Sequence, residues 1–311
     1  MRIIGVLTLL SILALQQVPS TQPPSGAGYY CPMHPDVTAA APGSCSRCGM
    51  KLIAGNPLDA VDYILEVQTS PRAVKAREKF DLILKARNPE TGQVAKEFEF
   101  AHEKLMHLFV VSQDLQHFYH LHPDAKPDGS FTIKLDVPQA GYYKLFAEFL
   151  PKGGTLQVNS RPLITAGYAG DLASMIPKLT ADLERIKTFE GMTVEMTSEP
   201  AQLIAGQQAH LNYVLADKES GQPINDLQPY LGAWGHTLVL NEDMTEYVHS
   251  HPSESIPAEA DPKTVRGGPT VSFEAFFPKP GMYRVWTQFM RSGKLTTVSF
   301  TVRVARLGLP N

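Results

Sequence analysis

Short runs of aliphatic and aromatic residues, separated by turn-forming residues, recur along most of the 311-residue chain. Clear examples are Phe80 to Ala86, Leu105 to Ser112 and Tyr142 to Phe149. Turn-forming stretches such as Pro127-Asp128-Gly129 separate these runs. Runs of this length that are bounded by Gly, Pro, Asn and Asp are typical of β-strands. The pattern therefore predicts an all-β protein.

Two long segments of the chain share one residue pattern, which begins at Leu65 in the first segment and at Val194 in the second. They align without a gap at a constant offset of 129 residues, until residues 253–268 form an inserted loop in the second copy. A repeat of this kind indicates two copies of one domain. Short strands at this spacing favour a β-sandwich. We predict two immunoglobulin-like or cupredoxin-like sandwiches, at residues 62–168 and 191–306.

The residues around and between the copies add two expectations. Gly141-x-Tyr143 and Gly281-x-Tyr283 resemble the corner tyrosine of immunoglobulin-like sandwiches. Residues 169–190 form a linker, in which apolar residues from Asp171 to Lys187 recur at helical intervals. That spacing favours a short helix, which Pro177 would start or kink.

The N-terminus has the layout of a secretory signal. A short basic start is followed by an apolar run from Ile3 to Leu15 and by small residues, which predicts a signal peptide at 1–20 and a linker at 21–28. The run is shorter than the roughly 20 residues that span a bilayer, although an uncleaved anchor stays an alternative. We expect a periplasmic or secreted protein without a membrane span after cleavage. The net charge of −3 gives no reason to expect a nucleic-acid partner.

All three cysteines lie in one module, at residues 29–54. Cys31-x-x-His34 and Cys45-x-x-Cys48 form two ligand pairs, which suit tetrahedral coordination by three thiolates and one imidazole. Met33 and Met50 add thioethers, which favour soft ions such as Cu(I). Three cysteines cannot all form disulfides within one chain, so the count also favours a metal site, a free thiol or an intermolecular bridge.

These residues closely resemble the heavy-metal-binding domain with the pattern Tyr-x-Cys-Pro-Met-His-Pro followed by Cys-x-x-Cys-Gly-Met. That domain accompanies copper-transporting P-type ATPases and some efflux adaptors. The resemblance implies a copper or zinc ion and a partner such as a membrane metal transporter or efflux component. Two alternatives remain open, namely a purely structural zinc site and a redox role for Cys45 and Cys48. The redox role lacks the βαβ context of thioredoxin-like proteins.

Each sandwich copy carries three histidines at equivalent positions. One histidine precedes a His-x-His pair by about a dozen residues, and a hairpin would bring the three imidazoles together. Three imidazoles suit Cu(II) or zinc, whereas the absence of cysteine from both copies argues against blue copper. The alternative is that these histidines are polar residues that hold a turn. His102 and His117 have no counterparts and are expected at the surface. The predicted ligands are His107, His120 and His122, and His236, His249 and His251.

The sequence thus predicts an exported heavy-metal-binding protein, with copper preferred and zinc as the alternative. Its role would be metal buffering, delivery or resistance. Two other functions stay open. One is a structural or adaptor protein whose Cys-rich module is held together by zinc, and the other is a copper-dependent oxidoreductase. No Gly-x-Ser-x-Gly motif and no paired carboxylates in a His-rich setting appear, so we expect no enzymatic activity.

Overall fold

The Cys-rich module folds as a small sheet at the start of the described chain. The computed structural model describes residues 28–32, 34–46, 51–59, 61–170, 176–257 and 259–308. The predicted signal peptide and most of the linker after it lie outside these residues. In the module, strand β1 (Tyr29–Tyr30) pairs with β2 (Thr38–Ala39) on one side and β3 (Ile53–Ala54) on the other. A short 3-10 helix, Pro57–Asp59, leads from the module to the first sandwich.

The first repeat forms two antiparallel sheets, with strand orders β4-β5-β10-β9 and β12-β11-β7-β8 and a short β6 paired with β11. In β5, buried and partly buried residues alternate strictly, so one face of this strand lies in the core. The bounds are β4 Ile64–Ser70, β5 Phe80–Arg87, β6 Phe98–Glu99, β7 Met106–Ser112, β8 Phe118–Leu121, β9 Asp124–Ala125, β10 Ser130–Leu135, β11 Tyr142–Pro151 and β12 Gln157–Ile164.

The second repeat has the same architecture, with sheets β13-β14-β16-β20 and β15-β22-β21-β18-β19 and a short β17 paired with β21. The all-β prediction with two repeated immunoglobulin-like sandwiches is confirmed. The bounds are β13 Ile186–Phe189, β14 Met192–Glu199, β15 Leu203–Ile204, β16 Gln208–Asp217, β17 Leu227–Gln228, β18 His236–Asn241, β19 Tyr247–Ser250, β20 Thr270–Phe276, β21 Gly281–Arg291 and β22 Lys294–Ala305.

Both sandwiches contain a tyrosine corner. The hydroxyl of Tyr143 donates a hydrogen bond to the Gln139 carbonyl at 2.9 Å, and that of Tyr283 donates to the Lys279 carbonyl at 2.8 Å. Each bond joins the start of a central strand to the loop four residues earlier, as in immunoglobulin-like sandwiches. The resemblance of the two Gly-x-Tyr motifs to this corner is therefore confirmed.

The linker between the repeats is not helical where the structure describes it. Residues 176–185 form no helix or strand, and β13 then adds an edge strand to the second sandwich by pairing with β14. The helix expected there is wrong over these residues, because this segment satisfies its backbone groups against repeat 2. The Asp182 amide donates to the Thr301 carbonyl at 2.9 Å. Residues 171–175 lie outside the described residues.

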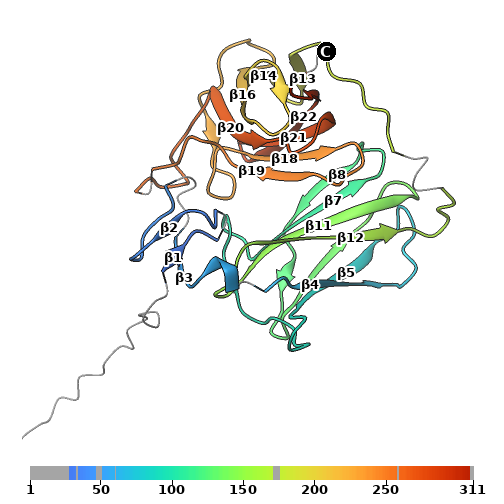
Figure 1. The fold of residues 1–311 in the computed structure, drawn as a ribbon. Helices are drawn as coiled ribbons and strands as arrows, with labels where there is room; N and C mark the ends of the chain where they lie inside the picture. Colours follow the sequence, from blue (N-terminus) through green and yellow to red (C-terminus); the bar gives the residue numbers. More distant parts are fainter. Residues whose placement is uncertain are drawn as a thin grey trace, which may run out of the picture.

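The two sandwiches pack face to face through the sheets that carry the predicted histidines (Figure 1). The contact includes the parallel stacking of Phe118 on Trp286, whose ring centroids are 5.1 Å apart, and of Phe146 on Tyr247, also at 5.1 Å. These two pairs are equivalent positions exchanged between the repeats, so the interface has approximate two-fold symmetry. Buried apolar residues of both repeats complete it: Phe109, Val111, Leu115, Phe146, Leu238, Leu240, Met244 and Trp286.

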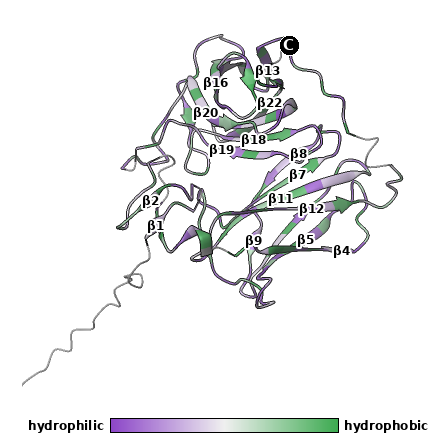
Figure 2. Ribbon diagram, viewed as in Figure 1, coloured by the Kyte–Doolittle hydropathy of each residue, from purple (hydrophilic) through white to green (hydrophobic). Residues whose placement is uncertain are grey.

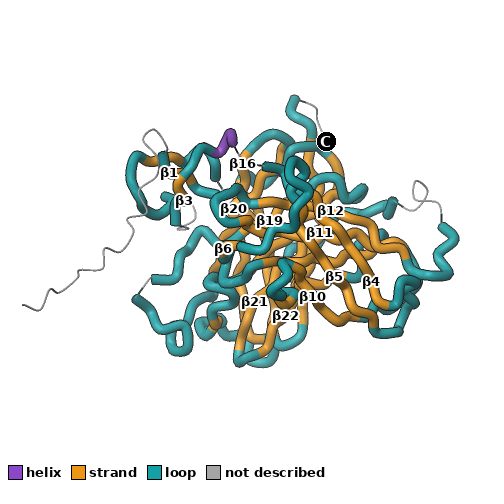
Figure 3. The backbone as a smooth tube through the Cα atoms, turned by 90° about the horizontal axis from the view of Figure 1, so that it is seen from below, coloured by secondary structure: helices purple, strands orange, loops and turns teal. Residues whose placement is uncertain are grey.

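Hydrophobic and hydrophilic segments alternate along the strands, as one-sided burial requires (Figure 2). Strands make up almost all of the regular structure, and the short 3-10 helix is the exception among the described residues (Figure 3). In the described part of the chain, no helix is long and apolar enough to span a membrane.

Candidate metal centres

In the module, three of the predicted ligands converge. The His34 Nδ1 atom lies 3.7 Å from the Cys31 sulfur and 3.6 Å from the Cys45 sulfur. A sulfur and a nitrogen bound to one tetrahedral zinc ion lie about 3.6 Å apart, given bond lengths of about 2.3 and 2.0–2.1 Å. The three side chains therefore fit a tetrahedral ion. Cys48, Met33 and Met50, which were also predicted as ligands, lie outside the described residues.

The module rests on the first sandwich close to one of its ligands. The amide of Leu156 donates a hydrogen bond to the carbonyl of Pro32 at 3.1 Å, and Pro32 directly follows Cys31. Leu156 directly precedes β12, the edge strand that pairs with β11. The module is thus attached to the sheet that also contains the first histidine triad.

The first triad consists of His107 on β7, His120 on β8 and His122 just after β8. These two strands form the predicted hairpin, with Phe109 opposite His120. The Nε2 atom of His120 lies 3.0 Å from the Nδ1 atom of His107 and 3.3 Å from the Nε2 atom of His122. Two nitrogens bound to one tetrahedral ion lie about 3.3 Å apart, so these distances fit a shared metal ion.

The hydrogen bonds of the first triad decide which ring nitrogens are available as ligands. The Nε2–H group of His107 donates to the Ala101 carbonyl at 2.9 Å, and the Nδ1–H group of His120 donates to the Gln288 side-chain oxygen at 2.8 Å. In neutral rings, the opposite nitrogens then carry lone pairs, and these are the two atoms that face each other at 3.0 Å. Two facing lone pairs repel unless a cation lies between them, which is the arrangement of a metal site.

The second triad repeats this arrangement with one change. The Nε2–H group of His236 donates to the Tyr230 carbonyl at 3.0 Å, and its Nδ1 atom lies 3.4 Å from the Nε2 atom of His249. The Nδ1–H group of His249 donates to a carboxylate oxygen of Glu148 at 3.0 Å. One ring nitrogen of His251 lies within 4.8 Å of the ligand nitrogens of His236 and His249. A histidine held by a carboxylate is a common support for a metal ligand.

Burial keeps most of these imidazoles neutral. It lowers the pKa of His107 to about 4 and that of His122 to about 3, with further lowering from neighbouring imidazoles. It also lowers the pKa of His120 and His236 well below the usual value. Neutral imidazoles are the form that binds metals, so these rings are ready to act as ligands at neutral pH.

Glu148 places a negative charge inside the interface. Burial alone would raise the pKa of its carboxyl, but the attraction of His249 and the hydrogen bond from its ring outweigh burial and hold the pKa at about 2. Only 2% of Glu148 is exposed, and among the described residues its salt-bridge partner is His249. An ionised buried carboxylate requires a nearby positive charge, which either a protonated His249 or a metal ion bound by a neutral His249 would supply.

The expectation that His102 is a surface residue is wrong. Its ring stacks on that of His251, with centroids 3.4 Å apart, and its Nε2 atom is buried. The error arose because His102 has no equivalent in the second copy. His117 lies outside the cluster in the turn before β8, where it is partly exposed.

Sequence reasoning also missed Glu148 and Gln288, which occupy equivalent positions on β11 and β21. Each orients a histidine of the other repeat. Glu148 is the one polar residue between Leu145 and Leu150, which is a signal that the sequence contained, whereas Gln288 follows the polar Thr287 and is less conspicuous.

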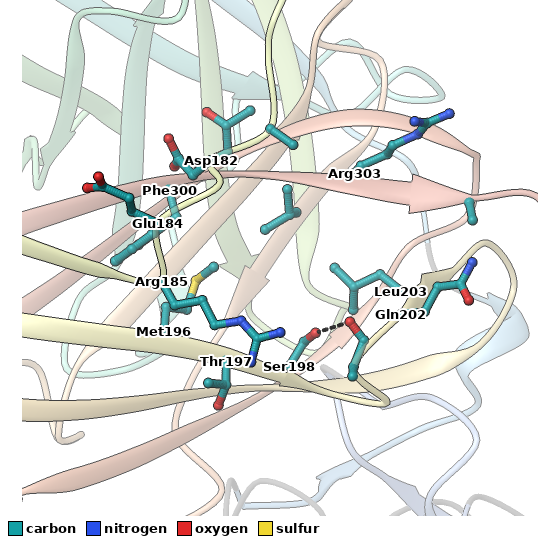
Figure 4. Close-up of a pocket in the computed structure, with 15 residues that line it drawn as sticks. Asp182, Glu184, Arg185, Met196, Thr197, Ser198, Gln202, Leu203, Phe300 and Arg303 are labelled. Atoms are coloured by element: carbon teal, nitrogen blue, oxygen red, sulfur yellow. Dashed lines mark hydrogen bonds between the residues drawn. The ribbon is translucent and has the colours of Figure 1, made fainter. Parts of the chain in front are cut away.

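Two pockets differ in their relation to these centres. One, of about 220 Å³, is lined by His122, Met106, Lys104 and Asp124, so it reaches one ligand of the first triad. Another, of about 270 Å³, lies between the linker and β14 in repeat 2 (Figure 4). There the Ser198 hydroxyl donates to the Ala201 carbonyl at 3.3 Å. This second pocket contains none of the metal-ligand groups found among the described residues.

Fold and site together define a class of protein: paired β-sandwiches with a metal-ligating module at the head and histidine triads at their interface. The family described as Domain of unknown function (DUF8832) matches residues 59–161 and 187–306, which is more than half of the chain. The chain belongs to that family. The family described as Heavy metal binding domain matches residues 29–54.

The chain is also similar in fold to solved structures of other proteins. The FdeC adhesin of Escherichia coli is 13% identical over 82% of this chain and 68% of its own, with a TM-score of 0.25. A two-domain fibronectin type III segment of chicken tenascin is 11% identical over 79% and 99%, with a TM-score of 0.22. The fibronectin(III)-like modules of Clostridium thermocellum CbhA are 12% identical over 80% and 97%, with a TM-score of 0.21. No curated protein matches the chain.

Proposed function

We propose that this protein is an exported metal-binding protein that holds copper, or alternatively zinc, for buffering, delivery or resistance. The match of the module to the heavy metal binding domain supports binding of a heavy metal. One observation supports metal binding by the sandwiches. The ring nitrogens of His107 and His120 that carry lone pairs face each other at 3.0 Å in the buried interface. Soft thiolates and thioethers in the module and imidazoles in the triads favour copper.

The N-terminal sequence supports the exported location, since its layout is that of a secretory signal. A metal store or carrier outside the cytoplasm would exchange its ion with a membrane metal transporter or efflux component. The pocket beside His122 provides a route by which an ion reaches the first triad from solvent.

Metal analysis of the full chain, purified without oxygen and loaded with Cu⁺ or Zn²⁺, tests the proposal. We expect Cys45→Ser to lose one metal equivalent and His120→Ala/His122→Ala to lose a second, independent class. The matched control is His117→Ala, which removes a partly exposed imidazole outside the cluster and should lose none. Full metal content in the cysteine variant would contradict the proposal for the module. One retained zinc and no metal at the sandwiches would favour the structural alternative.

A further inference from the structure

The two triads differ although their histidines are equivalent. Each repeat orients its middle histidine with the residue at the same β-strand position of the other repeat, but that residue is Gln288 for His120 and Glu148 for His249. The amide is neutral and the carboxylate carries a negative charge. A carboxylate behind a ligating imidazole makes the ring a stronger donor and adds attraction for a cation.

The second difference is an additional imidazole. The rings of His102 and His251 are stacked, and the Nε2 atoms of both are buried without a hydrogen-bond partner among the described residues. The ring of His102 also lies edge-on to that of His236, with centroids 6.1 Å apart. Because the two rings lie face to face, their in-plane lone pairs cannot converge on one ion, and His102 is not among the ligand atoms that lie within 4.8 Å of one another in the second triad. His102 comes from repeat 1 and therefore covers a ligand of the second triad across the interface.

The backbone around His102 is arranged for this position. A tight turn closes between Ala101 and Lys104, whose amides and carbonyls exchange hydrogen bonds, and His102 has a φ of 47°. Left-handed backbone is uncommon for residues other than glycine, but this turn has it in both repeats. The equivalent turn of repeat 2 contains Leu231 with a φ of 52°. The same turn therefore presents a ligand type in one copy and an apolar side chain in the other.

Solvent access differs in the same direction. His122 of the first triad lines an open pocket, whereas the Nε2 atom of its counterpart His251 is buried beneath His102. A ring that covers the third ligand and a carboxylate behind the middle one both favour slower loss of an ion from the second triad than from the first.

From these features we infer that the triad of repeat 2, which Glu148 supports and His102 covers, binds a metal ion more tightly than the triad of repeat 1. The inference rests on the proposed function, because it requires that the interface histidines bind metal. The ligand is a borderline cation such as Zn²⁺ or Cu²⁺, for which imidazole is a preferred donor. The protein would then combine one retained ion with one exchangeable ion at the same interface.

Zn²⁺ titration against a competing chromophoric chelator tests the inference, in full-length protein whose module is silenced by Cys45→Ser. We expect two affinity classes that differ by about 10-fold or more. His249→Ala should remove the tight class and His120→Ala the weak class. Glu148→Gln introduces the residue that repeat 2 has at the equivalent position, and should weaken the tight class by about 10- to 100-fold while the weak class stays unchanged.

Two further variants sharpen the test. Gln288→Glu should strengthen the weak class by about 10-fold, because it places a carboxylate behind His120 as Glu148 lies behind His249. The control His117→Leu should change neither class. Circular dichroism and urea unfolding establish that each variant is folded.

Equal affinities, a tight class that follows His120, or full binding in Glu148→Gln would each overturn the inference and leave the proposed function standing. If neither triad bound Zn²⁺, the inference would fall together with the interface part of the proposed function. Metal bound by the intact module would then still support the remainder of that function.

Discussion

In each triad, two imidazoles donate a hydrogen bond through the ring nitrogen that faces away from the other histidines, and this bond fixes the orientation of the ring. In His107 and His236 the acceptor is a backbone carbonyl six residues earlier, so this support is local and repeats in both copies. In His120 and His249 the acceptor belongs to the other repeat. The residue types and spacing in the sequence predicted the hairpin that brings the three imidazoles of each copy together, but neither of these supports. Nothing in the local pattern could pair His249 with a carboxylate 101 residues away.

A residue-level prediction concerns two glycines with positive φ. At Gly129 (φ 85°), an added Cβ would lie 2.3 Å from the Ala95 carbonyl oxygen, whereas at Gly92 (φ 68°) it would meet nothing within 4 Å. Gly92→Ala should therefore lower the free energy of unfolding by only about 1–2 kcal/mol, the cost of left-handed backbone. Gly129→Ala should cost clearly more because the backbone must shift. Urea unfolding measures both, and equal losses would contradict the expectation.

At the scale of elements, the linker shows where sequence reasoning failed. Its apolar residues recur at helical intervals, yet the segment before β13 lies extended against repeat 2. The carboxylate of Asp182 accepts hydrogen bonds from the Thr301 amide at 2.6 Å and from the Lys187 ammonium at 2.5 Å. Helical periodicity in a short segment is a weak signal, and hydrogen bonds to a neighbouring strand outweigh it.

Removal of this carboxylate should release the linker. Asp182→Ala leaves the Thr301 amide without its side-chain acceptor, which should cost about 1–3 kcal/mol and increase cleavage of the linker by a dilute protease. The matched control is Glu184→Ala, an exposed acidic residue two positions away, which should behave as the unchanged protein. Limited proteolysis with mass spectrometry of the fragments distinguishes the two variants.

At the scale of the whole molecule, the interface between the sandwiches holds both triads in place. Trp286 is 3% exposed and stacks on Phe118 of the other repeat. Trp286→Ala should cost about 3–5 kcal/mol, much of it from the contact between repeats. We expect a larger radius of gyration in small-angle scattering and weaker Zn²⁺ binding, because His102 and Glu148 would move away from the second triad.

The control for this variant is Ile164→Ala, which shortens an aliphatic side chain that is 52% exposed. It should leave both the radius of gyration and the metal affinity unchanged. An unaltered radius of gyration in Trp286→Ala would show that the stacking does not hold the repeats together.

Much of the fold could be predicted because its signals are local. Alternating burial defines strands such as β5, and the repeated Gly-x-Tyr motif marks the corner of each sandwich. Ligand identity within each hairpin is equally local, because His107 and His120 are only 13 residues apart and lie on paired strands.

The sequence by itself determined the two sandwiches, the Cys-rich module and the three histidines of each copy, since strand periodicity and ligand spacing depend on neighbours along the chain. Only the tertiary structure decided that the two triads meet, that Glu148 and Gln288 make them unequal, and that His102 stacks on His251. The contact between His120 and Gln288 joins residues 168 positions apart. It exists because the apolar outer faces of two sandwiches pack together, and the choice of packing partner depends on the complementary shape and burial of whole sheets.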